Sequence, residues 1–423
     1  MKKYLALTAL LLSGPVAAET IAITGATIHT LGDIGTIEDG TIVIDDGVIT
    51  AIGAAVEIPT DARTISARNS VVTPGLFDPI SYLGIVEISL VDNTVDHRQH
   101  GTRYSAAFDV APAINPRSTL IPINRIEGVT RAMVAPAPAS DGGSLISGLG
   151  AIMNLSGRDN YVEQPRAALF VHLGERGAGL SGGSRAAALL SLREALEDAR
   201  DYANNRGAYD SGRRRDYALS RYDLEALQPV LDGEIPMVVT VNRASDIEQV
   251  LQLAEDERID VVIRGGAEAW LVADQLAEAG VPVITDPTRN LPSAFESLNA
   301  SLESAARLDA AGVTVAFSIS ESHNARNLRQ LAGNAVANGM DYEAALRAVT
   351  VTAADIFASR GGGPLEVGQR AELVVWDGDP LEVTSFADAV YIDGQEIPMR
   401  SRQTLLRDRY LELDTEWPHA YPR

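Results

Sequence analysis

Side chains that could do chemistry gather in this chain just after three separate apolar runs. His172 and Glu175 follow the first run, Arg264 ends the second, and Glu321 and His323 follow the third. Imidazole and carboxylate groups are metal ligands, so His172, Glu175, Glu321 and His323 could hold an ion if they met. The guanidinium of Arg264 could instead pair with a carboxylate, either of this chain or of a ligand, through a two-pronged hydrogen bond.

Serines beside His323 offer a metal-free alternative. Ser318, Ser320 and Ser322 precede it at alternate positions. A nucleophilic serine needs a base in contact with its hydroxyl. Adjacent residues of an extended segment point to opposite faces, so Ser322 and His323 would diverge. The chain has no cysteine, which excludes thiolate ligands and cysteine nucleophiles.

Strand-like runs alternate with helical patterns through the middle of the chain, which is typical of βα units. We expect an α/β fold, a (β/α)8 TIM barrel, whose functional residues lie at the carboxyl ends of the strands. The pattern predicts barrel strands at 72–78, 129–134, 150–155, 167–173, 236–241, 260–264, 281–284 and 314–317. Outer helices are predicted at 186–204, 244–256, 267–279 and 299–311.

Two glycine- and serine-rich segments, 136–148 and 174–185, are expected to be loops after the second and fourth barrel strands. Each is interpreted as either a rim over a pocket or an inert connection. A polar stretch containing His97 and His100 is expected to form another loop over the barrel mouth, with both imidazoles at the surface.

Short alternating strands flank this middle on both sides, at 20–27 and 41–44 before it and at 371–376 and 389–392 after it. They predict a small β-sandwich assembled from the N- and C-terminal segments. We place this composite domain, with a C-terminal tail, at 19–72 and 364–423, and the barrel at 73–363.

The first residues have the pattern of a secretory signal peptide. Lys2 and Lys3 precede an apolar run at 5–12, and small residues at 16–18 predict cleavage after Ala18. The run is too short to span a bilayer. We therefore expect export to the periplasm.

The chain is strongly acidic, with a formal net charge of −22. Such a surface repels nucleic acid and anionic lipid, so neither is expected as a partner. The hydrophobic content of 46% is ordinary for a globular protein.

Several motifs resemble the amidohydrolase superfamily, in particular imidazolonepropionase-like and related periplasmic members. The resemblance covers nearly the whole chain after the leader. It rests on TPGLFD at 73–78, NRASD at 242–246, GGAEAW at 265–270, HNARNLR at 323–329 and LEVGQRAELVVWDGDPLE at 365–382. It implies a TIM barrel with a small β-sandwich, and metal-dependent hydrolysis of C–N bonds with Zn²⁺ or another divalent ion.

The ligand positions that the resemblance implies are occupied by residues unsuited to the family's chemistry. Ile80 and Tyr82 stand where a His-x-His pair would end the first strand, Thr240 and Arg264 where histidines would end the fifth and sixth, and Ser320 where an aspartate would end the eighth. No catalytic residue, metal or cofactor is therefore predicted.

Three interpretations of the remaining polar residues stay open. His172, Glu175, Glu321 and His323 could form a replacement metal site, although the fourth and eighth strands of such a barrel lie opposite each other. Arg264 could form an internal ion pair with Glu321 or Asp286, or anchor a ligand together with His172, Glu321 and His323.

The sequence thus predicts an exported, oligomeric, non-catalytic amidohydrolase homologue that serves as the partner subunit of an active one. A hydrolase of amide, cyclic amide or peptide bonds with a non-standard site, and a periplasmic solute-binding module for a small amide or peptide, are the alternatives.

Overall fold

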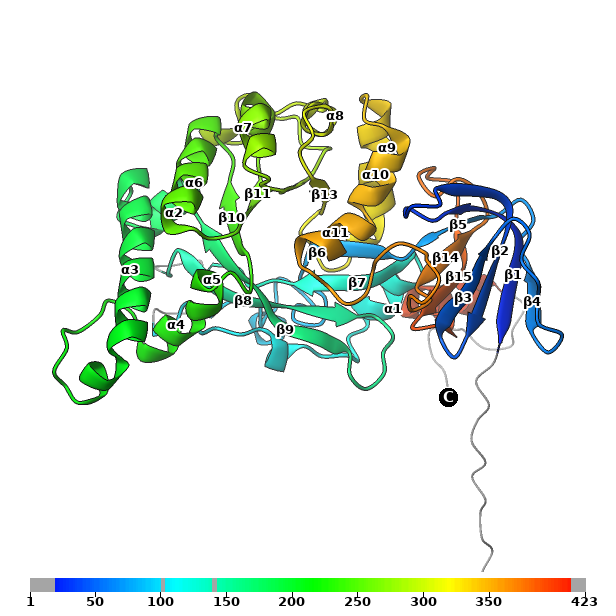
Figure 1. Ribbon diagram of the computed structural model, residues 1–423, viewed down its shortest axis with the longest axis horizontal. Helices are drawn as coiled ribbons and strands as arrows, with labels where there is room; N and C mark the ends of the chain where they lie inside the picture. Colours follow the sequence, from blue (N-terminus) through cyan, green and yellow to red (C-terminus); the bar gives the residue numbers. More distant parts are fainter. Residues whose placement is uncertain (1–19, 100–102, 139–142, 412–423) are drawn as a thin grey trace, which may run out of the picture.

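The computed structural model describes residues 20–99, 103–138 and 143–411, which form two eight-stranded sheets and the helices packed on them (Figure 1). The predicted signal peptide, His100 and the last twelve residues of the predicted tail lie outside the described part. Within these ranges no helix is both long and apolar enough to cross a membrane.

One of the two sheets forms a nearly closed barrel. Its strands follow one another in chain order: β6 (Leu76–Ser81), β7 (Val129–Val134), β8 (Ile146–Asn154), β9 (Val162–His172), β10 (Met237–Val241), β11 (Val261–Gly265), β12 (Val283–Thr285) and β13 (Val315–Phe317). Each overlaps one predicted strand, so the α/β barrel fold is confirmed. Polar contacts join β6 to the segment after β13, because Ser81 Oγ donates to the carbonyl of Glu321 at 3.2 Å.

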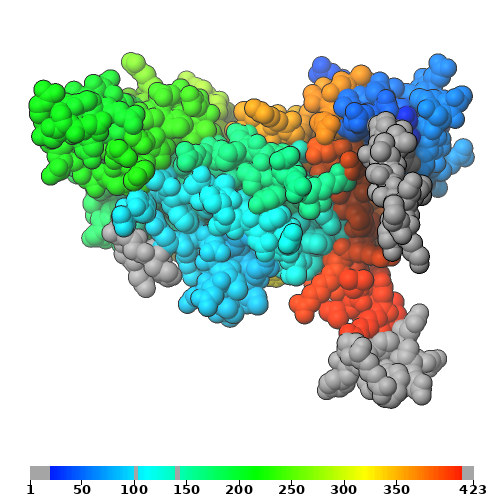
Figure 2. Space-filling view, turned by 90° about the horizontal axis from the view of Figure 1, so that it is seen from below, coloured from blue at the N-terminus to red at the C-terminus, as the bar shows by residue number. Residues whose placement is uncertain are grey.

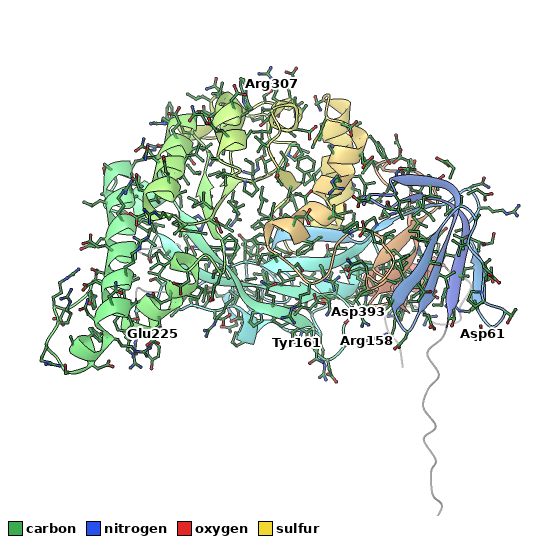
Figure 3. All side chains as sticks on the ribbon, in the orientation of Figure 1. Asp61, Arg158, Tyr161, Glu225, Arg307 and Asp393 are labelled. Carbon is green, nitrogen blue, oxygen red and sulfur yellow. The ribbon has the colours of Figure 1, made fainter. Side chains whose placement is uncertain are left out.

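One strand departs from the regular alternation of the fold. β8 pairs antiparallel with both β7 and β9, whereas the other neighbours in this sheet are parallel. The β8–β9 connection, which contains Arg158 and ends at Tyr161, is too short for the helical crossover that a parallel pair requires (Figure 3). The barrel is therefore interrupted by a hairpin at its third and fourth strands.

Helices cover the outside of the barrel beside β9–β13 (Figure 1). α6 shows why they form: Ile247, Val250 and Leu253 recur at helical spacing and are buried, and the helix ends at Arg258 in a left-handed conformation with φ of 55°. The helices after β8 are α2 (Gly174–Leu180), α3 (Arg185–Asp210), α4 (Arg221–Ala226), α5 (Gln228–Leu231), α6 (Ala244–Glu257), α7 (Ala273–Glu278), α8 (Ser304–Ala310), α9 (Leu328–Ala337), α10 (Tyr342–Ala348), α11 (Val351–Ile356) and α12 (Arg402–Leu411).

The remaining helices are short, and some of the elements differ from the prediction. α1 (Leu120–Arg125) precedes β7, and 3-10 turns lie at η1 (Asp92–Thr94), η2 (Ala111–Ala113), η3 (Ala269–Val272), η4 (Phe295–Ser297) and η5 (Ala325–Asn327). The helix predicted at 267–279 is split into η3 and α7. The segment 174–185 was predicted as a loop, but α2 fills its first half. Glu296 accepts the backbone N–H of Glu175 there, which satisfies a donor in the first turn of α2.

The second sheet combines the two ends of the chain, as expected, and Figure 2 shows those ends, blue and red, together at one end of the molecule. It contains β1 (Ile21–His29), β2 (Thr36–Asp45), β3 (Val48–Gly53), β4 (Arg63–Ser66), β5 (Val71–Pro74), β14 (Leu373–Trp376), β15 (Ala387–Ile392) and β16 (Gln395–Glu396). β5 pairs antiparallel with β14, so the two termini share one hydrogen-bonded sheet. Its core contains Ile23, Ile42, Leu373 and Tyr391.

A buried ionic cluster links the barrel to this second sheet. Arg131 on β7 donates to both carboxylate oxygens of Glu163 on β9 at 2.8 Å, and it also contacts Glu372, next to β14. The side chains of Arg131 and Glu372 are 3% and 4% exposed. Because a buried charge without a partner is costly, this cluster ties the two parts of the molecule together.

Candidate functional site

Three polar residues lie side by side at the carboxyl ends of neighbouring barrel strands. His172 ends β9, Thr240 lies in β10 and Arg264 in β11, and the register pairs Thr240 with both of the others. Two residues earlier on each strand, Phe170, Val238 and Val262 belong to the cluster that fills the barrel. Since side chains alternate along a strand, all three polar side chains also point inward, one layer above that cluster.

The hydrogen-bonding capacity of this row is largely unused. Arg264 Nη2 donates to the hydroxyl of Tyr82 at 3.2 Å. Arg264 Nη1, Thr240 Oγ1 and His172 Nε2 are buried and have no hydrogen-bond partner in the described part of the chain. Buried polar atoms in folded proteins are nearly always paired, so three open ones in one row require an explanation.

Asp78 lies at the same end of the barrel, on β6, and its side chain is wholly buried. Its Oδ1 accepts hydrogen bonds from Ser318 Oγ at 2.7 Å and from the backbone N–H of Ile80 at 3.2 Å. Oδ2 has no partner among the described residues. Burial raises the pKa of Asp78 to about 7, although the hydrogen bonds and nearby Arg264 oppose that rise.

The imidazole of His172 is neutral in this setting. Burial lowers the pKa of His172 to about 3, and the positive charges of Arg264 and Arg176 lower it further. Above the row, the ring of His97 lies 4.7 Å from that of Tyr82. The loop with His97 therefore covers the mouth as predicted, but His97 is half-buried and not at the surface.

A cavity of about 190 Å³ opens at this end of the barrel. Thr240 and Arg264 form part of its wall, together with Ser318 and Ser320. Arg289 also lines it, but this side chain is 76% exposed and pairs with Asp286. The wall is thus polar, and Arg264 is its half-buried cation.

Two buried glutamates hold the loops around this cavity. Glu296 accepts hydrogen bonds from Asn242 Nδ2 at 2.8 Å and from the N–H of Glu175 at 2.6 Å. Glu268 accepts from the N–H of Ala244 at 3.1 Å and from Asn299. The motifs at 242–246 and 265–270 thereby connect the loops after β9, β10, β11 and β12. Sequence analysis missed Glu296 as an organiser, because an isolated glutamate in a loop gives no local signal of that role.

The structure places some of the predicted site residues in the barrel or its mouth and leaves Glu321 and His323 exposed. Ile80 is packed in the apolar filling of the barrel, and Tyr82 receives the bond from Arg264. Ser320 lines the cavity in a left-handed conformation with φ of 54°. The side chains of Glu321 and His323 are exposed and are not brought to His172 or Arg264 by any hydrogen bond or ion pair.

The internal ion pair considered for Arg264 is not formed. Asp286 instead accepts from Thr288 Oγ1 at 2.6 Å and pairs with Arg289 at 3.4 Å. Glu321, the other candidate, is exposed. Within the described ranges no carboxylate oxygen lies within 4.0 Å of the Arg264 guanidinium. The carboxylate of Asp286 is thus bound by Thr288 and Arg289 in the turn after β12, and it does not pair with Arg264.

The serine–histidine alternative also lacks its geometry. The single O–H of Ser318 is shared between Asp78 Oδ1 at 2.7 Å and the carbonyl of Ile80 at 2.8 Å, and its oxygen accepts the N–H of Ser320. Ser322 is buried while His323 is exposed, which agrees with the divergence expected of adjacent residues. These contacts bind β13 to β6 and do not activate a nucleophile.

The residues at the mouth do not fit the family's metal ion. In the described part of the chain, no three histidine, aspartate or glutamate side chains come together in a way that could hold one. Ile80 has no lone pair to offer, and the guanidinium of Arg264 would repel a dication. His172, the one buried imidazole in the row, lies in the positive field of Arg264 and Arg176.

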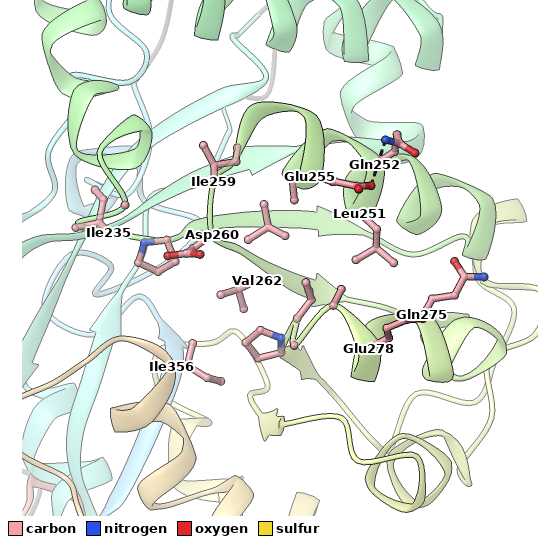
Figure 4. Close-up of a pocket in the computed structure, with 18 of the residues that line it drawn as sticks. Ile235, Leu251, Gln252, Glu255, Ile259, Asp260, Val262, Gln275, Glu278 and Ile356 are labelled. Atoms are coloured by element: carbon pink, nitrogen blue, oxygen red, sulfur yellow. Dashed lines mark hydrogen bonds between the residues drawn. The ribbon is translucent and has the colours of Figure 1, made fainter.

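A larger cavity, of about 850 Å³, lies at the opposite ends of the strands (Figure 4). Its wall includes Leu251, Ile259 and Val262, with Glu255 hydrogen-bonded to Gln252 at 3.4 Å. No histidine lines it. Because function in barrels of this kind resides at the carboxyl ends of the strands, we assign the functional site to the smaller cavity.

Comparisons with known proteins agree with the fold. Residues 225–398 match the model of the "Amidohydrolase family". The structure resembles an amidohydrolase from Thermotoga maritima, with a TM-score of 0.79, 24% identity, and 90% of this chain and 100% of that chain covered. It also resembles a prolidase solved with N-methylphosphonate-L-proline, with a TM-score of 0.55, 18% identity, and coverage of 90% and 100%.

Similarity to a curated protein is limited to a short segment. Over 143 residues the chain is 29% identical to the amidohydrolase tasK of Hapsidospora irregularis. The match covers 27% of this chain and 15% of that protein. It therefore carries no argument about the activity of the whole chain.

Proposed function

We propose that the chain is an exported, non-catalytic member of the amidohydrolase family that serves as the partner subunit of an active homologue, because residues 225–398 match the family model and the barrel resembles that of an amidohydrolase. The observation that carries the non-catalytic assignment is the position of Arg264. A guanidinium occupies the inward-facing end of β11, where the family resemblance places a metal-binding histidine. A fixed cation there excludes a dication by repulsion.

A hydrolase with a non-standard site is favoured by one observation, the raised pKa of Asp78. A carboxyl group that titrates near neutral pH is suited to acid–base catalysis. Asp78 is wholly buried, however, and its Oδ1 is engaged by Ser318 and Ile80. These contacts support a role in closing the barrel between β13 and β6.

Exposed apolar side chains around the mouth support the partner-subunit role. Leu90 follows β6 and is 94% exposed, and Phe295 follows β12 and is 82% exposed. Ile88, Val91, Leu291 and Leu298 on the same two loops are also exposed. We call these six residues the apolar rim. Exposed large apolar side chains gathered on a loop are typical of protein–protein interfaces.

Co-expression tests the partner role. The chain is produced together with a homologous amidohydrolase that retains a His-x-His pair, and complex formation is measured by size-exclusion chromatography with light scattering. Phe295→Asp should abolish the complex, and Leu190→Asp, at a 67% exposed position on α3, should leave it intact. Absence of a complex with the parent chain would contradict the partner role.

A hydrolysis screen tests the non-catalytic assignment separately. The purified mature chain is assayed against amides, cyclic amides and dipeptides, with added Zn²⁺ and with chelator. We expect no turnover that depends on metal. Turnover that chelator abolishes and Zn²⁺ restores would show that the ligand set has been wrongly assigned.

A further inference from the structure

The unpartnered polar atoms at the barrel mouth form a candidate binding site for a ligand, which we call the seat. Arg264 Nη1 and Thr240 Oγ1 belong to residues on the cavity wall, and both atoms are buried without a partner. His172 is 6% exposed, and its Nε2 is likewise unpartnered beside Thr240. A guanidinium N–H and a hydroxyl are donors, and a neutral imidazole donates through one nitrogen. Arg264 and Thr240, which pair on neighbouring strands and both line the cavity, thus offer two unpartnered donors to an acceptor there.

The charge of the seat favours an anionic acceptor. Arg264 has no carboxylate within 4.0 Å among the described residues, and Arg289 is exposed and already paired with Asp286. A planar carboxylate also matches the geometry of a guanidinium better than a spherical anion does.

We propose that the barrel mouth binds the carboxylate of a compact organic acid between the guanidinium of Arg264 and the hydroxyl of Thr240. The proposal rests on the proposed non-catalytic function, because a metal ion in the same place would exclude Arg264 from this role. The fold then uses the former position of the metal as an anion seat.

The rest of the cavity indicates the size and polarity of the acid. Its volume of about 190 Å³ accommodates a molecule of the size of an N-acetyl amino acid. Ser320 and Asn242 line the opening and could meet an amide group next to the carboxylate, while Ile284 and Ile319 contribute apolar wall. N-acylated small amino acids are therefore the ligand class that fits best.

Calorimetric titration of the full mature chain with sodium N-acetylglycine tests the proposal, with N-acetylglycinamide as the uncharged probe of equal size. We expect the acid to bind and the amide not to. Arg264→Met should weaken binding at least about tenfold, because hydrogen bonds to charged groups are strong. The isosteric Thr240→Val should weaken it about two- to tenfold. Arg289→Gln, which alters the exposed arginine of the same cavity, should change it less than about twofold.

Each other outcome would overturn the proposal. Absence of binding, equal binding of acid and amide, or unchanged binding by Arg264→Met would each rule out the assigned seat. Equal losses in Arg264→Met and Arg289→Gln would indicate a diffuse positive field instead. Thermal melting verifies that each variant is folded. If Arg264→Met does not fold, Thr240→Val still tests the seat.

The same samples separate this proposal from the non-catalytic assignment. NMR spectra of the probe after incubation should show intact N-acetylglycine. Chelator-sensitive conversion to acetate and glycine would contradict the non-catalytic function while leaving carboxylate binding in place. Intact probe without binding would contradict the seat alone.

Discussion

Replacing Asp78 by asparagine should make the stability of the protein less dependent on pH. Asparagine resembles the protonated carboxyl in shape, and its Oδ1 can still accept from Ser318 and Ile80. Burial raises the folded-state pKa of Asp78 from 3.8 to about 7. The folded state therefore holds this proton more tightly than the unfolded state does. The associated stability is complete below the unfolded pKa and is lost as the pH rises through the folded one.

The size of the change in unfolding free energy follows from the pKa shift of Asp78. One pKa unit corresponds to about 1.4 kcal/mol, so the total loss is roughly 4 kcal/mol, of which about 2–3 kcal/mol falls between about pH 5 and pH 8. Urea unfolding of the parent and of Asp78→Asn across this range measures it. The difference in unfolding free energy should move in favour of the variant by about 2–3 kcal/mol as the pH rises.

Ser318→Ala gives a matched variant, because it keeps the carboxyl and removes a hydrogen bond that lowers its pKa. The pH-dependent loss of stability should then extend to higher pH than in the parent. Identical pH profiles for the parent and Asp78→Asn would refute the reasoning, since Asp78 would then be ionised in the folded protein and paired more closely with Arg264.

Three further predictions concern separate features of the molecule. Arg264→His should bind no metal and change the unfolding free energy by less than about 1 kcal/mol, because no carboxylate partner is lost; a loss of about 3–5 kcal/mol in urea unfolding would reveal a buried pair. Arg131→Met should destabilise the protein by about 3–5 kcal/mol, since it leaves Glu372 buried and uncompensated, and a variant as stable as the parent would show that the cluster is solvated. Mass spectrometry of the periplasmic protein should find an N-terminus at or near Glu19, and full-length chain recovered from the cytoplasm would contradict export.

Much of the fold could be predicted because the apolar periodicity of a barrel strand is local. β7 begins and ends at the predicted residues, and every other barrel strand overlaps its prediction. The antiparallel direction of β8 was missed because periodicity carries no information about direction. α2 was missed because glycine and serine suggest a loop, whereas the bond from Glu175 to distant Glu296 supports a helix.

The candidate site was only partly predictable for a related reason. The position of Arg264 at the end of a barrel strand followed from the motif pattern. The hydrogen-bond partner of Arg264 could not be predicted from that pattern. Asp286 is bound by Thr288 within its own turn, and Tyr82, which contacts Arg264, is 182 positions away in the sequence. The unpartnered polar atoms of Thr240 and His172 could not be predicted either, because they depend on the register between two strands that are distant in the sequence.

Metal content tests the central claim most directly. The mature protein is purified without chelator, equilibrated with Zn²⁺, Mn²⁺ or Co²⁺, passed through a desalting column and measured by plasma mass spectrometry. Because Arg264 and Ile80 stand where the family resemblance implies metal-binding histidines, we predict well under one equivalent of any of these metals per chain. Close to one tightly held equivalent would contradict the account.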